Sequence, residues 1–396
     1  MILAVVLVIF PLKLRSFGTI DFAQYWSGWN LLINGQNPYQ SIFANQGELD
    51  VTLFPGEITH SWNPPWTYTL LSPVVSLPFT ASAIVWCLLE VSALFFIALR
   101  GPQALKTKGI GVIWGAVSVL VFLPSLYSIQ YGQLGILFAF SLTTFLLAVN
   151  SKAYAWAGLS LIPLTAKPHL FLLCGIPGVL WLTQLPARDA ARFLWGSVGG
   201  FAALLGATVA IAPTSLSNWL HAIATSPGDA QVVHLTSWMT HTTATATRLF
   251  LIDTINSNPT WPLTVIPGIA CIATSLYFII RRPVIEWSML LPRVLCISLG
   301  TSSYGWIHDQ TVLVLCPLLL FSIALSRESA RSRALIISAA LLPQLISLAY
   351  VASSPQAMRA FFILPWVYLL LLLIVLPDDQ KVQTRHKDEL RSPRPG

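Results

Sequence analysis

Long apolar stretches separated by short polar turns run along almost the whole chain. A helix needs roughly 20 mostly apolar residues to cross the hydrocarbon core of a bilayer, and several stretches approach that length. Those at 153–166 and 294–305 are short, so the pattern predicts about 10 to 12 transmembrane helices. The expected fold class is therefore an all-α, polytopic integral membrane protein. The apolar stretches lie near residues 1–14, 80–99, 109–127, 133–149, 153–166, 168–184, 193–212, 262–280, 294–305, 310–326, 334–351 and 361–377.

Two stretches depart from this pattern. Residues 66–79 are interrupted by Pro73 and Pro78, which predicts an interfacial or re-entrant helix instead of a span. The first stretch, 1–14, has about 12 apolar residues where roughly 17 are needed, and it lacks the basic start of a signal peptide. We expect either a start codon assigned too late or a first helix that is short and tilted.

The composition supports a membrane protein. The chain is 55% hydrophobic and 9% charged, whereas a soluble domain is about a quarter charged. We expect a single transmembrane domain over residues 1–377, with long outer loops at about 15–65 and 213–261. Residues 378–396 are polar and charged, which predicts a disordered cytoplasmic tail.

The distribution of basic residues predicts the orientation in the membrane. With the N-terminus inside and the apolar stretches threaded alternately, 17 of the 22 Lys and Arg residues fall on the inner side. Cytoplasmic loops carry such an excess. The net charge of +7 is therefore explained by these loops and the tail, and we expect no nucleic-acid partner.

An acidic residue and several aromatic residues follow the first apolar stretch. Asp21 stands either as a solvated loop charge or as a functional group at the outer face. Around it, an apolar stripe predicts a helix over 22–34 that lies flat on the membrane. Its aromatic rings, with those of Tyr25 and Tyr39, suit both anchoring in the headgroup zone and stacking on sugars. The stripe consists of Phe22, Trp26, Trp29 and Ile33.

Motifs in a fixed order extend through most of residues 19–320. They comprise Asp21-Phe22-Ala23-Gln24-Tyr25-Trp26, Leu31-Leu32-Ile33-Asn34-Gly35-Gln36-Asn37-Pro38-Tyr39, Asn63-Pro64-Pro65, Ser72-Pro73, Tyr131-Gly132-Gln133, Ala157-Gly158, Ala166-Lys167-Pro168 and Ser303-Tyr304-Gly305-Trp306-Ile307-His308-Asp309. Together they resemble glycosyltransferase family 87, a branch of the membrane-embedded C-type glycosyltransferases. That family includes mannosyltransferases that use polyprenyl-phosphate-mannose. Family members often carry Asn where this chain has Gly135, so no role of that Asn is transferred.

The resemblance implies a bundle of transmembrane helices in the plasma membrane, with an active site on the extracytoplasmic side. It implies a polyprenyl-phosphate sugar donor, a lipid or glycan acceptor, and transfer with inversion that requires no metal and no cofactor. The catalytic base of the family is an acidic residue in the first outer loop, and Asp21 is the matching position.

The residues themselves fit this chemistry. A sugar hydroxyl is a poor nucleophile, and a positioned carboxylate such as Asp21 helps by accepting its proton. The departing lipid phosphate needs cations or hydrogen-bond donors, and Lys167 and His308 are expected on the same face. Pro163 and Pro168 flank Lys167, which fits a broken helix pair that reaches a polar site. The alternative for Lys167 is a helix-end lysine that reaches towards water.

Further side chains are expected to complete the site. We expect Tyr25, Trp26 and Trp29 to shape the sugar and lipid site. Asp309 either orients His308 or caps the next helix, and these alternatives stay open. The remaining substrate contacts are expected from Gln133 and Tyr304.

Other functions are less well supported. No HExxH or HxxxH pattern occurs, so we expect no metal site, and no phosphate-binding loop for a nucleotide sugar is present. The alternative function is a transporter or flippase of lipid-linked sugars, which would bind through the same aromatic and cationic residues. Such proteins often show inverted repeats and midplane charges, and neither is evident in this sequence.

Overall fold

The computed structural model describes residues 20–39, 63–107, 115, 118–119, 122–225, 241–255, 259–327, 329–353 and 361–376, with only the backbone described for 20 and 344–353. These residues form helices and turns, and no strand occurs among them. The predicted span 1–14, much of the span 109–127 and the predicted tail 378–396 lie outside the described residues.

Twenty helical segments follow one another through the described residues. The first half contains α2 (Ile20–Ile33), α3 (Pro65–Val75), α4 (Phe79–Ala104), α6 (Leu123–Tyr131), α7 (Gly135–Asn150), α8 (Tyr154–Ser160), η2 (Ile162–Ala166), η3 (Pro168–Leu170), α9 (Leu172–Gln184), α10 (Ala187–Leu194), η4 (Trp195–Gly199) and α11 (Gly200–Ile211). The second half contains α12 (Ser215–Thr225), α13 (Thr243–Ile255), α14 (Pro262–Arg281), α15 (Trp287–Thr301), η6 (Ile307–Val314), α16 (Leu315–Leu325), α17 (Ala330–Ser353) and α18 (Leu364–Val375).

The expected all-α, polytopic membrane fold is confirmed. Four helices in the described part are long and apolar enough to cross a membrane: Phe79–Ala104, Ala187–Ile211, Pro262–Arg281 and Ile307–Leu325. Five shorter apolar helices accompany them: Gly135–Asn150, Tyr154–Ala166, Leu172–Gln184, Trp287–Thr301 and Phe361–Val375. The two stretches that the sequence showed to be short, 153–166 and 294–305, therefore correspond to two of these shorter helices of the bundle.

Proline and extended residues explain where boundaries differ from the apolar pattern. The stretch predicted at 168–184 begins with a single 3-10 turn, so its α-helix starts only at Leu172. The stretch predicted at 294–305 starts earlier, at Trp287, and ends at Thr301 because Ser302 is extended, with φ −55° and ψ 151°. The loop after Ser302 is thereby released from the helix to build the site described below.

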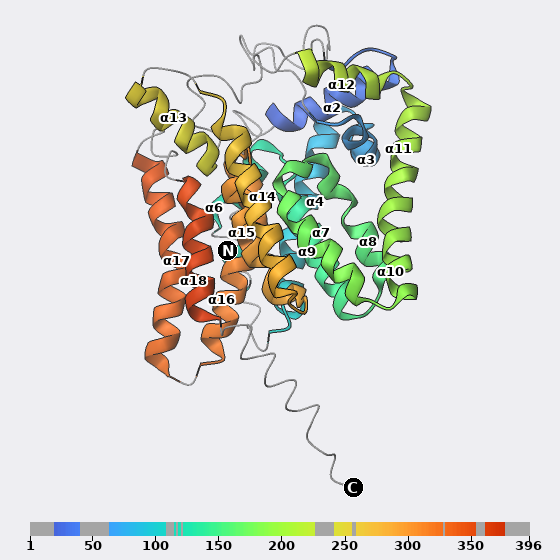
Figure 1. Cartoon of the computed structure of the whole chain (residues 1–396). Coiled ribbons are helices and arrows are strands. Elements are labelled where there is room, and N and C mark those ends of the chain that lie inside the picture. Colours follow the sequence, from blue (N-terminus) through green and yellow to red (C-terminus); the bar gives the residue numbers. More distant parts are fainter. Residues whose placement is uncertain are drawn as a thin grey trace.

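The predicted cytoplasmic turns and the predicted outer loops lie at opposite ends of the bundle, as expected if successive helices cross the membrane in alternating directions. Turns predicted to be cytoplasmic contact one another: Lys106 Nζ lies 2.7 Å from Glu286 Oε1, and Gln184 Nε2 donates to the Pro283 carbonyl at 2.9 Å. Figure 1 shows α2, α12 and α13, which come from the two predicted outer loops, at the opposite end from the α16–α17 turn. Which end faces the cytosol stays a prediction from the charge distribution.

The predicted helix after Asp21 exists as α2, but its apolar stripe faces the protein. Phe22 and Trp26 are only 1% and 6% exposed, whereas Ile33 is 50% exposed. The Phe22 ring stacks on Trp86 of α4 with centroids 5.7 Å apart, and Trp26 Nε1 donates to the Leu77 carbonyl at 2.8 Å. The expectation that this stripe lies on the membrane is therefore wrong, because α3 and α4 offer a packed apolar surface in place of lipid.

Two glycines permit close packing at this end of the bundle, one between α6 and α2 and one between α7 and η6. Gly132 ends α6 in the left-handed conformation, with φ +66°, which favours glycine. A Cβ on Gly135 would overlap the backbone carbonyl oxygen of His308. The first turn of α7 therefore packs against the start of η6 without room for a side chain, which explains why glycine occupies this position.

The tight contact at Gly135 predicts a stability effect. We expect Gly135→Ala to destabilise the protein by about 1–3 kcal/mol, because a methyl group there forces two backbone segments apart. The matched control is Gly178→Ala in α9, where a Cβ meets nothing within 4 Å. Removing a helical glycine should leave stability unchanged or raise it by up to ~1 kcal/mol. Thermal unfolding in detergent measures both, and equal Tm values for Gly135→Ala and the unaltered protein would contradict the packing.

Candidate active site

A continuous set of buried polar side chains joins four separate segments at one end of the bundle. Lys167 Nζ forms an ion pair with Asp309 Oδ1 at 2.7 Å and donates to Gln133 Oε1 at 3.3 Å. The hydroxyl of Tyr25 donates to the same Gln133 oxygen at 2.9 Å. We call these four residues, Tyr25, Gln133, Lys167 and Asp309, the Lys167 cluster. The resulting network connects α2, the α6–α7 turn, the η2–η3 junction and η6.

Local sequence explains why Lys167 points into the bundle. Its backbone, with φ −137° and ψ 66°, interrupts two 3-10 turns. Pro168 disfavours the helical conformation for the preceding residue. Lys167 therefore cannot continue the helix, and its side chain is only 10% exposed. The prediction of a broken helix pair around this lysine is consistent with that geometry.

Asp309 performs one of the two roles that the sequence left open: it caps the next helix, whereas its Oδ1 lies 3.8 Å from His308 Nε2, too far for a hydrogen bond that would orient this histidine. Its Oδ2 accepts a hydrogen bond from the Trp306 backbone N–H at 2.9 Å, which caps the start of η6. Its Oδ1 accepts a hydrogen bond from the Lys167 ammonium group. The carboxylate is fully buried. A buried charge needs such partners, and removal of one member of a buried ion pair typically costs about 3–5 kcal/mol.

The Lys167–Asp309 pair changes how Lys167 can act. An ammonium group has three N–H donors. In the part of the chain that the structure describes, Lys167 meets two acceptors, Asp309 and Gln133. One donor is left for a ligand, and Asp309 offsets the positive charge. Lys167 is thus an oriented hydrogen-bond donor within a neutral pair.

Asp21 lies in the first turn of α2 and is half-buried. It precedes Tyr25 by four residues, a spacing that places two side chains on one helix face. Burial and then the charge of Asp21 raise the pKa of Tyr25 well above its usual value. Burial and then Asp21 also raise the pKa of Tyr131 at the end of α6. Asp21 is therefore within electrostatic reach of both tyrosines, at the edge of the Lys167 cluster.

His308 lies beside the Lys167 cluster between two aromatic rings. It stacks on Trp306 with centroids 5.9 Å apart, and the Tyr131 ring is tilted against it at 6.3 Å. Its Nε2 is 3.8 Å from Asp309 Oδ1, which is too long for a hydrogen bond. Among the described residues this buried nitrogen has no hydrogen-bond partner. An unsatisfied buried polar atom is costly, so Nε2 is a candidate ligand contact.

The sequence analysis missed His169. It follows Lys167-Pro168, and its ring stacks on Tyr304 with centroids 4.2 Å apart. Burial lowers the pKa of His169 to about 4, so the imidazole is neutral at pH 7. Burial also raises the pKa of Tyr304. A histidine next to a lysine that reaches a polar site was the one sequence signal for this contact.

The remaining predicted residues lie elsewhere. Trp26 and Trp29 are 6% and 7% exposed and belong to the packed core. The predicted site residues therefore divide into two groups. The structure joins Tyr25, Gln133, Lys167 and Asp309 directly, places Asp21, His308 and Tyr304 around them, and leaves Trp26 and Trp29 in the apolar core.

The chemistry of this arrangement combines one half-buried carboxylate with buried hydrogen-bond donors. The carboxylate of Asp21 can accept a proton. Lys167 and the unpartnered nitrogen of His308 can hold the oxygens of an anion. Within the described ranges, no group of three or more His, Cys, Asp and Glu side chains could hold a metal ion.

Comparison with known proteins identifies the family. The model of glycosyltransferase family 87 matches residues 62–303, more than half of the chain. This range contains Gln133 and Lys167, whereas Asp21 and the segment 304–309 lie outside it. No curated protein and no solved structure matches the chain. On the family match, together with its apolar helices, the chain belongs to glycosyltransferase family 87 and is a membrane glycosyltransferase.

Proposed function

We propose that the protein transfers a hexose, namely mannose, from a polyprenyl phosphate to a lipid or glycan acceptor at the extracytoplasmic face of the plasma membrane. The observation that carries the proposal is the hydrogen-bonded Lys167 cluster. Through it, the helix that bears Asp21 is fixed to the buried donors that would receive a phosphate. No metal takes part.

Asp21 is the general base of the proposed reaction. It accepts the proton of the acceptor hydroxyl while the hydroxyl oxygen forms a bond to the anomeric carbon of the sugar. The bond between that carbon and the phosphate oxygen breaks on the opposite side, which inverts the configuration. The lipid phosphate leaves with the electron pair. A half-buried position, as Asp21 has, leaves part of the carboxylate accessible to a substrate.

The departing phosphate is stabilised by oriented donors in this proposal. Lys167 contributes its remaining N–H, and His308 donates from Nε2 in the neutral tautomer that carries its hydrogen there. Donors fixed before the reaction stabilise developing negative charge without reorganisation at the moment of bond cleavage. Gln133 and Asp309 orient Lys167, and Tyr304 lies against the neighbouring His169.

The aromatic residues of α2 act by fixing its position. Trp26 and Trp29 are packed in the core, and Tyr25 is bonded to Gln133. They shape the sugar and lipid site by holding Asp21 at its edge. The alternative function, a flippase of lipid-linked sugars, has no structural observation in its favour, and family membership supports the transferase.

Asp21→Asn tests the base directly. We expect transfer from a radiolabelled polyprenyl-phosphate sugar to fall by about 10²-fold or more, because the amide cannot accept the proton. Asp253→Asn, which alters an exposed carboxylate on α13, should leave transfer unchanged. Near-normal transfer by Asp21→Asn would exclude the role, and sugar translocation without transfer by the purified protein would favour the flippase.

A double substitution separates phosphate binding by Lys167 from its structural ion pair. Lys167→Met alone should lower the free energy of unfolding by about 3–5 kcal/mol, because Asp309 stays buried without its partner. Lys167→Met combined with Asp309→Asn removes both charges and should regain much of that stability. We expect transfer to stay low in the stable double variant. If transfer returned with stability, Lys167 would have a structural role only.

Metal independence is tested by chelation. Transfer by the purified protein should be unchanged after incubation with excess EDTA, because the proposed charge stabilisation comes from Lys167 and His308. The measurement is the initial rate with and without EDTA, and with Mg²⁺ or Mn²⁺ restored. A rate lost with EDTA and regained with one of these ions would contradict the proposed mechanism.

A further inference from the structure

A row of four aromatic rings runs beside the Lys167 cluster. Tyr127 and Tyr131 of α6 stack with centroids 6.0 Å apart and planes 8° from parallel. Tyr131 is tilted against His308 at 6.3 Å, and His308 stacks on Trp306 at 5.9 Å. Tyr127 and His308 are buried, whereas Tyr131 and Trp306 are only half-buried. His308 therefore has an accessible ring beside it on either side, and each of these rings is held by a buried ring.

Tyr131 is also close to Asp21. A Cβ on the next residue, Gly132, would overlap the side chain of Phe22, which directly follows Asp21 in α2. The end of α6 thus packs on the first turn of α2. Burial and then the charge of Asp21 raise the pKa of Tyr131, as expected for a phenol beside a carboxylate. Tyr131 is therefore a neighbour of both Asp21 and His308, which come from distant parts of the chain.

The proposed reaction defines where the sugar must lie. In a displacement with inversion, the acceptor oxygen approaches the anomeric carbon from the side opposite the departing oxygen. Asp21 receives the proton of the acceptor, and His308 and Lys167 hold the phosphate. The hexose is accordingly located between the base and the phosphate donors. Tyr131 is the half-buried aromatic residue that adjoins both sides of that interval.

An aromatic ring held in this way suits a hexose. One face of a pyranose ring consists of C–H bonds with slightly positive hydrogens, and the face of an aromatic ring is slightly negative. The stacking of Tyr127 already orders the Tyr131 ring, so less side-chain freedom is lost when a ligand binds. Trp26 and Trp29, expected from the sequence to shape the sugar site, are packed in the core. Tyr131 can take over the stacking role that the sequence analysis assigned to them.

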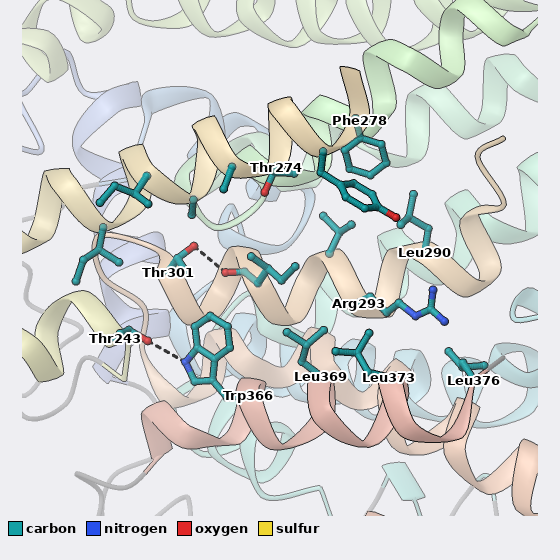
Figure 2. Close-up of a pocket in the computed structure, with 17 residues that line it drawn as sticks. Thr243, Thr274, Phe278, Leu290, Arg293, Thr301, Trp366, Leu369, Leu373 and Leu376 are labelled. Atoms are coloured by element: carbon teal, nitrogen blue, oxygen red, sulfur yellow. Dashed lines mark hydrogen bonds between the residues drawn. The ribbon is translucent and has the colours of Figure 1, made fainter. Parts of the chain in front are cut away.

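The groove between α14, α15 and α18 is poorly suited to a sugar. It has a volume of about 870 Å³, and among the described residues that line it there is none of Asp21, Lys167 and His308. Figure 2 shows that its lining is mostly apolar, with side chains such as Phe278 and Leu369. The hydroxyl groups of a hexose would lose hydrogen bonds to water there, which is costly. The ring row beside His308 is therefore the better position for the sugar.

We propose that Tyr131 is a sugar-binding residue whose ring stacks on the hexose of the donor between Asp21 and His308. The inference rests on the proposed function, because that function supplies a hexose on a lipid phosphate. The ring contacts the sugar and not the phosphate or the lipid. Trp306, on the other side of His308, does not contact the sugar.

A pair of matched lipids tests this contact without catalysis. One is polyprenyl-phosphate-mannose, and the other is polyprenyl methyl phosphate, a diester of equal charge in which a methyl group replaces the sugar. We expect the full-length protein, without acceptor, to bind the mannosyl lipid about tenfold more tightly, the ratio that 1.4 kcal/mol produces. Tyr131→Leu should reduce this ratio to about one and leave the Kd of the methyl lipid unchanged, because the ring contacts only the sugar.

Two further variants define the contact. Tyr131→Phe keeps the ring and should keep the tenfold ratio, and Trp306→Leu should leave the ratio unchanged. A ratio lost in Trp306→Leu but kept in Tyr131→Leu would place the sugar on the other side of His308 and overturn the proposal. So would an equal loss of affinity for both lipids in Tyr131→Leu, an equal loss of the ratio in Tyr131→Phe and Tyr131→Leu, or a ratio near one in the unaltered protein.

A labelling measurement needs no variant and separates this inference from the proposed function. Polyprenyl-phosphate-mannose with a photoreactive group on the sugar should label the α6 segment that contains Tyr131 in the unaltered protein. Unlabelled polyprenyl-phosphate-mannose should compete about tenfold better than polyprenyl methyl phosphate. Such labelling without any sugar transfer would contradict the proposed function and support the sugar contact. Transfer with labelling confined to other segments would support the proposed function and overturn the sugar contact.

Discussion

The end of the bundle that carries the candidate active site depends on one buried ion pair, between Lys167 and Asp309. Neither charge would be stable there alone, because desolvation of an unpaired ion costs several kcal/mol. Asp309 also caps η6, and Lys167 reaches Gln133, which in turn receives Tyr25. One electrostatic constraint therefore sets the position of η6, the η2–η3 junction, the α6–α7 turn and α2 together. The helix that presents Asp21 is located by that constraint.

Close backbone packing is the second requirement of this arrangement. The first turn of α7 approaches η6 so closely that a Cβ on Gly135 would overlap the His308 carbonyl oxygen. Gly132 turns the chain back in the left-handed conformation and places Gln133 towards Lys167. Any larger side chain at position 135 would need a different distance between these two segments. Glycine at this position is thus coupled to the local geometry of the site.

Much of the fold was predictable because membrane solvation imposes long apolar stretches, and Pro163 and Pro168 marked the break at Lys167. The partners of Lys167 were harder to predict from the sequence. Asp309 is 142 positions away, and no local pattern reveals such a contact. The direction of the α2 stripe was also misjudged, because an apolar helix face has the same sequence pattern whether it meets lipid or protein. His169 was missed because one histidine carries no periodic signal.

The neutrality of the ion pair has a consequence for how a membrane enzyme could handle a lipid phosphate. A free lysine in a low-dielectric site would attract any phospholipid headgroup, because Coulomb attraction grows as the dielectric constant falls. With Asp309 beside it, Lys167 offers directed hydrogen bonds and little net charge. Discrimination between phosphates must then come from the geometry of the donors at the site. Because Asp309 and Gln133 fix the direction of the Lys167 ammonium group, its remaining N–H favours a phosphate oxygen in one position over any anion that is merely nearby.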